Sequence, residues 1–362
     1  MKQPVTLANW RQAPHNRWAF HHVRELIPTA DIANDPRRIR DFPVDRKSMP
    51  ADFERFLAAT DTDGLVILHR GRQIAERYGN GMTAEQPHIL MSVSKSMLGL
   101  LVGLLRLDVE RRVAEFLPEL KDTAYRDATL RHLLDMRAGV AFEEDYLATS
   151  GPIVEYRKAT GWNPLAPGET PSDLRSFYSQ LKKPDGSHWG RFHYISPNTD
   201  LLGLVIEAAA GRPYAELMSE HLWKPIAAER SAYITVDRFG APRTAGGMCV
   251  TVRDLARVGQ WLIENPSPWI DDIERNGDRT AWDAGSFVPY YPGMPMKYRS
   301  KWYVLEGKSP LMFGMGIHGQ NLFVDRANQL VIAKVSSQAA PLDAPRIALT
   351  MQAISEIRKH LA

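Results

Sequence analysis

Met91-Ser92-Val93-Ser94-Lys95-Ser96-Met97 opens an apolar run that continues to Leu105. The spacing predicts a helix with Ser92 in its first turn and Lys95 on the same face. A serine hydroxyl is a weak nucleophile until a nearby base takes its proton, and the Lys95 amine is such a base. The unpaired N–H groups of the first turn suit an oxyanion. The alternative is that Ser92 only caps the helix while Lys95 is solvated, because so short a motif recurs by chance.

The composition of the whole chain is that of an ordinary globular protein. It has 362 residues, of which 44% are hydrophobic and 24% charged, so it is long enough to bury a sizeable core. The net charge of +3 comes from 45 basic and 42 acidic residues. Such a balance gives no reason to expect nucleic acid or an anionic membrane as a partner. The composition leaves a homodimer open.

Two further features limit the compartment and the chemistry. Segment 1–11 has no apolar core, so we expect no signal peptide, and the longest apolar run is too short to span a bilayer. We therefore expect a soluble, cytoplasmic protein.

The single cysteine, Cys249, excludes an intrachain disulfide and a cysteine-rich zinc site. His21, His22 and Glu25 have no second ligand cluster at zinc spacing, so we expect no metal site.

The order of the predicted elements indicates an α+β protein. Strands over 64–70 and 73–78 flank a tight turn and predict a β-hairpin just before the helix of Ser92. Strands return near the C-terminus, so we expect one sheet built from distant segments. The other predicted elements are helices near 128–136, 199–210, 213–222 and 252–264, strands at 302–305, 320–325 and 329–335, and a helix at 345–360.

This order divides the chain into three parts. Residues 1–48 are polar and read as an arm packed on the body. Residues 49–109 and 285–362 form a sheet domain, and 110–284 form a mainly helical domain. A cleft between two such domains is a common ligand site.

Two later segments carry candidate chemistry. In Arg191-Phe192-His193-Tyr194-Ile195-Ser196, a loop enters a predicted helix, and Tyr194 is a candidate general acid or base. The alternative is a half-buried loop aromatic. In Gly314-Met315-Gly316-Ile317-His318-Gly319, the glycines allow close backbone approach before a strand. A backbone N–H of this loop, that of Ile317, is a candidate partner for the Ser92 N–H in an oxyanion hole; the alternative is an ordinary turn.

Together these segments resemble the serine β-lactamase and penicillin-binding protein superfamily, in its class C branch. Ser92-x-x-Lys95 matches the family's first motif, and Tyr194-Ile195-Ser196 matches the tyrosine motif, with Gly203 at the usual distance. Blocks at 130–140 and 246–257 support the likeness, which spans roughly residues 50 to 360. The resemblance implies an antiparallel sheet flanked by helices, a mainly helical domain, and an active site in the cleft between them.

The departures from the family pattern concern the substrate. Ser196 stands where β-lactamases have asparagine, and Gly314-Met315-Gly316 replaces Lys-Thr-Gly, so the cation that meets a β-lactam carboxylate is absent. Both changes argue against an efficient β-lactamase. They resemble the 6-aminohexanoate-dimer hydrolases and β-lactamase-like esterases of the branch. Segment 106–109 is shorter than the family norm, and whether this is a deletion stays open.

The resemblance also implies roles for particular residues. Ser92 attacks a carbonyl, Lys95 or Tyr194 takes its proton, and Tyr194 returns it to the leaving group; which of the two is the base stays open. The N–H groups of Ser92 and Ile317 hold the oxyanion, and Ser196 aligns Lys95. Neither metal nor organic cofactor is needed. The remaining implied substrate-binding residues are Gly316, His318, Tyr146 and Trp302.

The function expected from the resemblance is cleavage of a small amide or ester, most like a 6-aminohexanoate-dimer hydrolase with carboxylesterase activity. A D-amino-acid-specific peptidase or amidase and a weak β-lactamase are alternatives. A penicillin-binding-like sensor without catalysis is an alternative of another class. The intact set of Ser92, Lys95 and Tyr194 argues against a mere binder.

Overall fold

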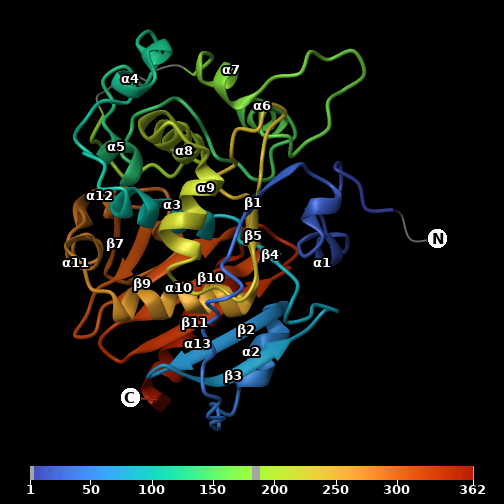
Figure 1. Ribbon diagram of the computed structural model, residues 1–362, viewed down its shortest axis with the longest axis vertical. Helices are drawn as coiled ribbons and strands as arrows, with labels where there is room; N and C mark the ends of the chain where they lie inside the picture. The colour runs from blue at the N-terminus through green and yellow to red at the C-terminus, as the bar shows by residue number, and fades with distance from the viewer. Residues whose placement is uncertain (1–3, 182–187, 362) are drawn as a thin grey trace.

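The computed structural model describes residues 4–181 and 188–361 and contains two antiparallel sheets surrounded by helices (Figure 1). The larger sheet has seven strands in the order β3-β2-β11-β10-β9-β8-β7. Its strands are β2 (Thr62–His69), β3 (Arg72–Tyr78), β7 (Met296–Arg299), β8 (Trp302–Leu305), β9 (Leu311–Gly316), β10 (Gln320–Asp325) and β11 (Leu330–Ser336). The predicted α+β class and the hairpin are confirmed. The predicted glycine loop at 314–319 is only partly a loop, since its first three residues belong to strand β9.

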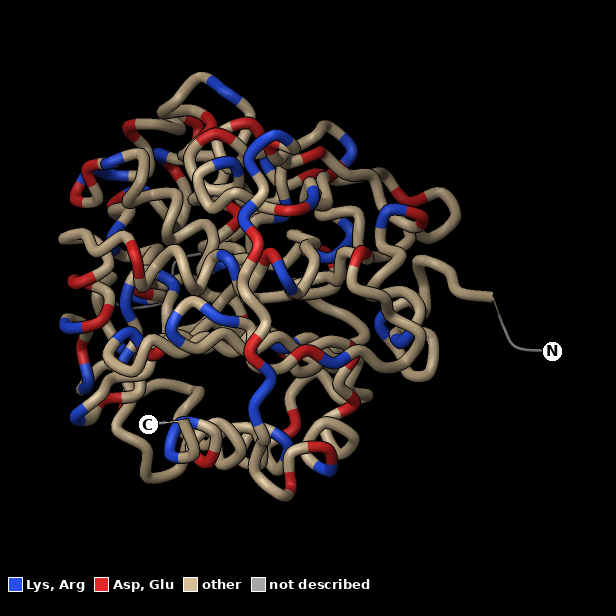
Figure 2. The backbone as a smooth tube through the Cα atoms, turned by 60° about the horizontal axis from the view of Figure 1, so that its bottom comes forward, with Lys and Arg blue, Asp and Glu red and all other residues tan. Residues whose placement is uncertain are grey.

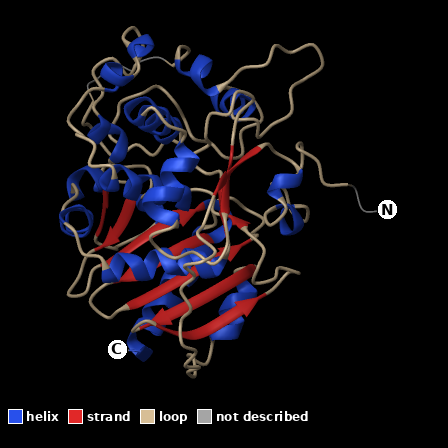
Figure 3. Cartoon of the chain, in the orientation of Figure 1, coloured by secondary structure: helices blue, strands red, loops and turns tan. Residues whose placement is uncertain are grey.

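The larger sheet is buried on both faces, and its side chains alternate between two cores. Along β2, Val66 and Leu68 pack in one core, whereas Leu65 and Ile67 pack in the other. The first core lies under α10 (Val252–Glu264), which crosses β2, β10 and β11 (Figure 3). The second lies under α2 (Phe53–Ala59) and the C-terminal helix α13 (Ala344–Leu361). Burial on both sides explains why β2 and β11 are almost continuously apolar.

A second sheet of four short strands corrects the expectation of one sheet. Its order is β1 (Thr29–Ile32), β5 (Ala232–Thr235), β6 (Met248–Val250) and β4 (His88–Ile89). Two of these strands lie in the part predicted to be mainly helical. Strands of two to four residues show too little alternation to be recognised from sequence, and here their burial comes from tertiary packing.

Helices α4, α5, α6, α7 and α8 lie above α3 (Val93–Leu104) in Figure 1, whereas α1 and α11 lie lower in this view. The predicted helices at 199–210, 252–264 and 345–360 are confirmed as α8, α10 and α13, and the helix near 128–136 is the shorter α5. The domain limits at 48, 109 and 284 stay a prediction. The remaining helices are α1 (Asn16–Ala19), α4 (Val113–Phe116), α5 (Leu130–Leu134), α6 (Pro152–Ala159), α7 (Leu174–Tyr178), α8 (Pro197–Ala210), α9 (Tyr214–Met218), α11 (Pro268–Arg275) and α12 (Arg279–Asp283).

Charged residues of both signs are interspersed along the backbone (Figure 2). Among the residues that the structure describes, no helix combines the length and the apolar character that crossing a membrane requires.

Helix α3 (Val93–Leu104) is the element that carries the Ser92 motif, and it is buried all round from residue 93 to residue 102. It packs against α8 on one side and against β8, β9 and β10 on the other. The closest approach is at Gly99, where an added Cβ would lie 2.1 Å from the carbonyl oxygen of Ser300. The absence of a side chain at this position lets the helix lie directly on the backbone before β8.

We expect Gly99→Ala to destabilise the fold, although alanine is the better helix former by about 1 kcal/mol. Overpacking a core costs typically about 1–3 kcal/mol, and a backbone carbonyl cannot rotate away as a side chain can. Urea denaturation should therefore give a lower free energy of unfolding than for the parent protein. An unchanged or higher value would contradict this account of how α3 is seated.

Candidate active site

Ser92 lies at the N-terminus of α3, just after a sharp turn. The chain leaves β4, and the Leu90 N–H donates to the Met248 carbonyl over 2.8 Å. Met91 then takes a left-handed conformation with φ of 45°, which is costly for a side chain of this size. As the helix cap, Ser92 has a backbone N–H with no acceptor inside the helix. The turn thus presents both its hydroxyl and its N–H at the helix end.

The Lys95 amine contacts the Ser92 hydroxyl, as the spacing predicted. Lys95 Nζ lies 2.8 Å from Ser92 Oγ, 3.0 Å from Ser196 Oγ and 2.8 Å from the carbonyl oxygen of Ala245. The lysine is 1% exposed, so the solvated lysine of the alternative interpretation is wrong. Sequence reasoning missed the Ala245 carbonyl, because a backbone acceptor in a distant segment leaves no motif.

A carboxylate completes this polar cluster. The Ser196 hydroxyl and the Ser196 N–H both donate to the carboxylate of Glu144. Because its one proton goes to Glu144, the Ser196 oxygen is an acceptor toward Lys95. The Tyr146 hydroxyl also hydrogen-bonds to Glu144. Sequence reasoning missed Glu144, because nothing in its local sequence points to Ser196, 52 residues away.

Burial sets the protonation of Lys95. Desolvation lowers the pKa of its amine to about 7, with a smaller upward contribution from the Glu144 carboxylate and a downward one from Arg243. Near neutral pH the amine is therefore present in comparable amounts with and without its extra proton. A lysine in this state is able to accept a proton from its neighbour.

Tyr194 also contacts the cluster and is 4% exposed. Its ring is 4.9 Å from Lys95 Nζ, and its hydroxyl hydrogen-bonds to Ser92. Burial among aromatic rings, Phe287 at 4.6 Å between centroids and Tyr303 at 6.4 Å, raises the pKa of Tyr194. The phenol is therefore neutral at physiological pH, which favours proton donation over action as a phenolate base.

The end of β9 lies against the backbone of Ser92. An added Cβ on Gly316 would be 2.6 Å from the Leu90 carbonyl oxygen and 2.9 Å from the Ser92 nitrogen. Ile317 follows directly, and His318 has a left-handed φ of 62°. The missing side chain at Gly316 brings this backbone to the N-terminus of α3, where the predicted oxyanion hole would lie.

A cavity of about 530 Å³ adjoins this cluster and is lined by Tyr146, Ile317 and His318, among others. The His318 Nδ1–H donates to the Gln338 carbonyl over 2.7 Å, and burial lowers the pKa of this histidine to about 4. Its ring is thus neutral at neutral pH. The predicted residues Tyr146, Ile317 and His318 therefore line one cavity, which is linked to the Ser92 cluster through Glu144 and Gly316.

Trp302 is not part of this site. It is fully buried in the core on β8 and does not line the cavity, so its implied contact with substrate is not supported.

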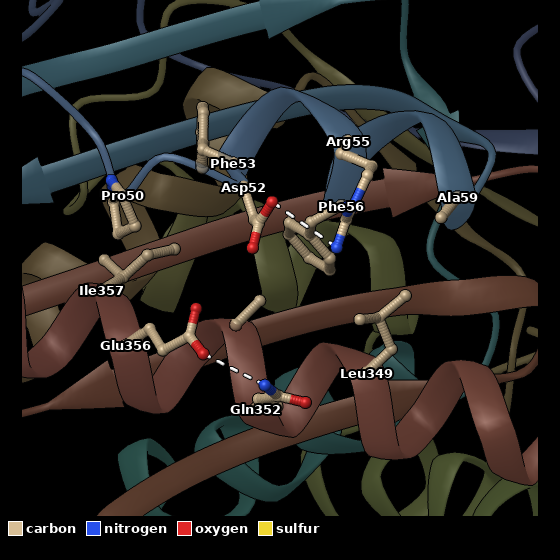
Figure 4. A pocket seen from close by; sticks show the side chains of 11 residues that line it. Pro50, Asp52, Phe53, Arg55, Phe56, Ala59, Leu349, Gln352, Glu356 and Ile357 are labelled. Carbon is tan, nitrogen blue, oxygen red and sulfur yellow. Dashed lines mark hydrogen bonds and ion pairs between the residues drawn. The ribbon is translucent and has the colours of Figure 1, made fainter.

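A smaller cavity between α2 and α13 is lined by Phe56 and Ile357, with Arg55 facing Asp52 and Gln352 facing Glu356 (Figure 4). It contains none of the predicted site residues.

Metal ligands do not gather anywhere in residues 4–181 and 188–361: no group of three or more histidine, cysteine or acidic side chains is arranged to hold an ion. His21 instead contacts the Arg17 carbonyl through Nε2 at 2.8 Å, and His22 contacts that of Trp18 through Nδ1 at 2.8 Å.

Comparison with known proteins finds a family model and several similar proteins. The family model described as Beta-lactamase matches residues 50–354. A 6-aminohexanoate-dimer hydrolase of Paenarthrobacter ureafaciens is 34% identical over 353 residues, covering 93% of this chain and 89% of that protein. Esterase EstB of Burkholderia gladioli is 27% identical over 191 residues, about half of either chain. The structure of a candidate 6-aminohexanoate-dimer hydrolase from Bacillus anthracis superposes with a TM-score of 0.89 at 26% identity, covering 100% of this chain and 98% of that one.

Proposed function

Because the chain belongs to the β-lactamase family and is a serine hydrolase related to 6-aminohexanoate-dimer hydrolase, we propose that it cleaves an amide or ester of a small carboxylic acid through an acyl-enzyme on Ser92. Its natural substrate would be a short linear amide, with esters as faster artificial substrates. The geometry of Lys95 is the observation that carries this proposal.

A neutral lysine amine has two N–H donors and one lone pair. In this site, the Ala245 carbonyl can only accept, and the Ser196 hydroxyl has its proton committed to Glu144. These two acceptors therefore take both N–H groups of the neutral amine. The lone pair is left facing the Ser92 hydroxyl at 2.8 Å, which is the arrangement of a base beside its nucleophile.

The first half of the reaction forms the acyl-enzyme. Ser92 Oγ attacks the carbonyl carbon while its proton moves to Lys95 Nζ, giving a tetrahedral intermediate whose oxyanion would be held by the N–H groups of Ser92 and Ile317. Tyr194 then donates its proton to the leaving amine or alkoxide as the carbon–nitrogen or carbon–oxygen bond breaks. The Lys95 ammonium then gives its proton to the Tyr194 phenolate, so both groups return to their starting protonation states.

The second half releases the acid. Water attacks the acyl carbon while Lys95 Nζ takes one of its protons. As the bond between the acyl carbon and Ser92 Oγ breaks, Lys95 gives that proton to Ser92 Oγ, and the carboxylic acid leaves. The raised pKa of Tyr194 and the lowered pKa of Lys95 together favour Lys95 as the base and Tyr194 as the acid.

We expect Ser92→Ala to abolish labelling by a serine-reactive phosphonate and to lower the turnover of 4-nitrophenyl butyrate by about 10³-fold or more. Lys95→Ala and Tyr194→Phe should each lower kcat by about 10²-fold or more, since they act in the same proton transfers. Ser94 lies on the same helix, and its hydroxyl accepts from the Met248 N–H and is not a hydrogen-bond partner of Lys95 Nζ, so Ser94→Ala is the matched control.

Ser94→Ala should still be labelled by the phosphonate. Full turnover in Ser92→Ala would refute the proposed nucleophile. Activity on 6-aminohexanoate dimer, D-amino-acid amides and nitrocefin, measured with the same preparation, separates the proposed amidase from a peptidase and from a β-lactamase. A stable adduct without turnover would identify a sensor instead.

The pH dependence of kcat/KM tests the role of Lys95. Activity requires the amine without its extra proton, so kcat/KM should rise through a pKa of about 7 and level off above it. The Glu144 carboxylate raises that pKa, so Glu144→Gln should move the rising limb to lower pH. Glu143 is exposed and adjacent in sequence, and Glu143→Gln should leave the limb in place. A limb that moves to higher pH in Glu144→Gln would contradict this assignment.

A further inference from the structure

The cavity beside Ser92 has two guanidinium groups on its wall that no carboxylate neutralises by direct contact. Arg11 comes from the N-terminal arm, and Arg157 comes from α6. Within the described part of the chain, neither has an acidic oxygen within 4 Å, whereas most of the buried arginines of this protein make such a pair. One buried and one half-buried cation without direct counter-charges are unusual and call for a ligand.

Arg157 is 8% exposed, and its donors go to backbone only. It donates to the Tyr146 carbonyl over 3.0 Å and to the Ala148 carbonyl over 3.3 Å. These hydrogen bonds hold the loop that carries Tyr146. Backbone carbonyls accept the hydrogen bonds of the Arg157 guanidinium but do not neutralise its charge, so its positive potential extends into the cavity.

Arg11 is held in place by aromatic and amide contacts rather than by an acid. It donates to the Asn163 side-chain oxygen over 2.5 Å, and its guanidinium carbon is 5.5 Å from the Trp10 ring centroid and 5.8 Å from that of Trp162. Burial, together with the charges of Arg157 and Arg243, lowers the pKa of Arg11. Even so, a guanidinium stays protonated at neutral pH. A bound anion would therefore offset the desolvation free energy of these two charges.

The other charged groups around the cavity do not supply that anion. Lys158 lines it too but pairs with Glu155 over 3.0 Å and with Glu169 over 2.5 Å. The Glu144 carboxylate acts on Arg157 only through space, since its oxygens are taken by Ser196 and Tyr146. The charged residues that line the cavity are thus Arg11, Arg157 and Lys158, with no acidic side chain among them, and of the three only Lys158 makes an ion pair.

The cavity is linked to the reaction centre at two points. Ile317 lines the cavity, and the preceding Gly316 lies against the Ser92 nitrogen. Tyr146 lines it as well and is bonded through Glu144 to Ser196. A substrate with its carbonyl at Ser92 would extend into the cavity past these two residues.

We propose that Arg11 and Arg157 form an anion subsite that binds a carboxylate on the substrate of Ser92, so that the enzyme prefers amides and esters bearing a negatively charged group. This inference rests on the proposed function and names its substrate class. Guanidinium groups suit the purpose, because their planar forks match the two oxygens of a carboxylate. The same charges would disfavour a substrate with an ammonium group in this position.

The experiment compares esters that differ only in the charge at the far end of the chain. The acyl series uses the 4-nitrophenyl esters of hexanoic acid, of adipic acid as its monoester, and of 6-aminohexanoic acid. A second series places the carboxylate on the leaving group, as in hydroxybenzoate esters against phenyl esters. We expect kcat/KM for the anionic ester to exceed that of its neutral partner by about tenfold or more in at least one series, the ratio typical of a charge-assisted hydrogen bond.

Arg157→Gln and Arg11→Gln should each reduce that preference by about tenfold while changing the rate on the neutral ester far less. Arg11→Lys and Arg157→Lys should keep part of it, because the charge remains without the fork. Lys158→Gln removes a cation from the same cavity that is already paired, so the preference should persist in it. Adipate itself should inhibit the parent enzyme competitively and inhibit the two glutamine variants less.

Equal kcat/KM for anionic and neutral esters in both series, or a preference that survives both glutamine substitutions, would overturn the subsite. Thermal unfolding of each variant shows whether it is folded. If Arg157→Gln disorders the loop that carries Tyr146, the result for Arg11→Gln, on the separate N-terminal arm, still tests the anion subsite. Turnover of the neutral ester and its loss in Ser92→Ala report on the proposed function alone, so the two hypotheses fail independently.

Discussion

The burial of one amine is the constraint on which the rest of the site depends. Lys95 is removed from water at the base of α3, and this desolvation brings its pKa close to neutrality. A buried amine is tolerated only when its hydrogen-bonding groups are satisfied, and Ser92, Ser196 and Ala245 do this from three separate segments. Glu144 then orients Ser196. The nucleophile, its base and the loop of Tyr146 are thus tied into one network.

Close backbone packing places that network. Gly99 lets α3 lie on the carbonyl of Ser300, and Gly316 lets the end of β9 reach the Ser92 nitrogen. Left-handed residues flank both candidate oxyanion donors, with Met91 directly before Ser92 and His318 directly after Ile317. Such conformations cost energy, and they persist because the surrounding core determines them. The two buried faces of the larger sheet supply this rigidity.

The cavity beside the network differs from it in charge. Inside the cluster, Glu144 balances Lys95, whereas on the cavity wall Arg11 and Arg157 lack direct acidic partners among the described residues. The arm at the N-terminus contributes one of these two arginines and packs its Trp10 against Trp162, 5.2 Å between ring centroids. The N-terminal segment 1–48, predicted as a polar arm, therefore contributes residues to the cavity into which the substrate would extend.

The sequence by itself determined the helix of Ser92, the hairpin, the strands at 302–305, 320–325 and 329–335, and the pairing of Ser92 with Lys95. These depend on spacing within a few residues, and local periodicity records such spacing. Only the tertiary structure decided that there are two sheets, that Trp302 is core, that Glu144 holds Ser196 from 52 residues away, and that Arg11 joins Arg157. The physical reason is that burial, and with it every pKa and every unpaired charge, is set by contacts between distant segments, which no local pattern specifies.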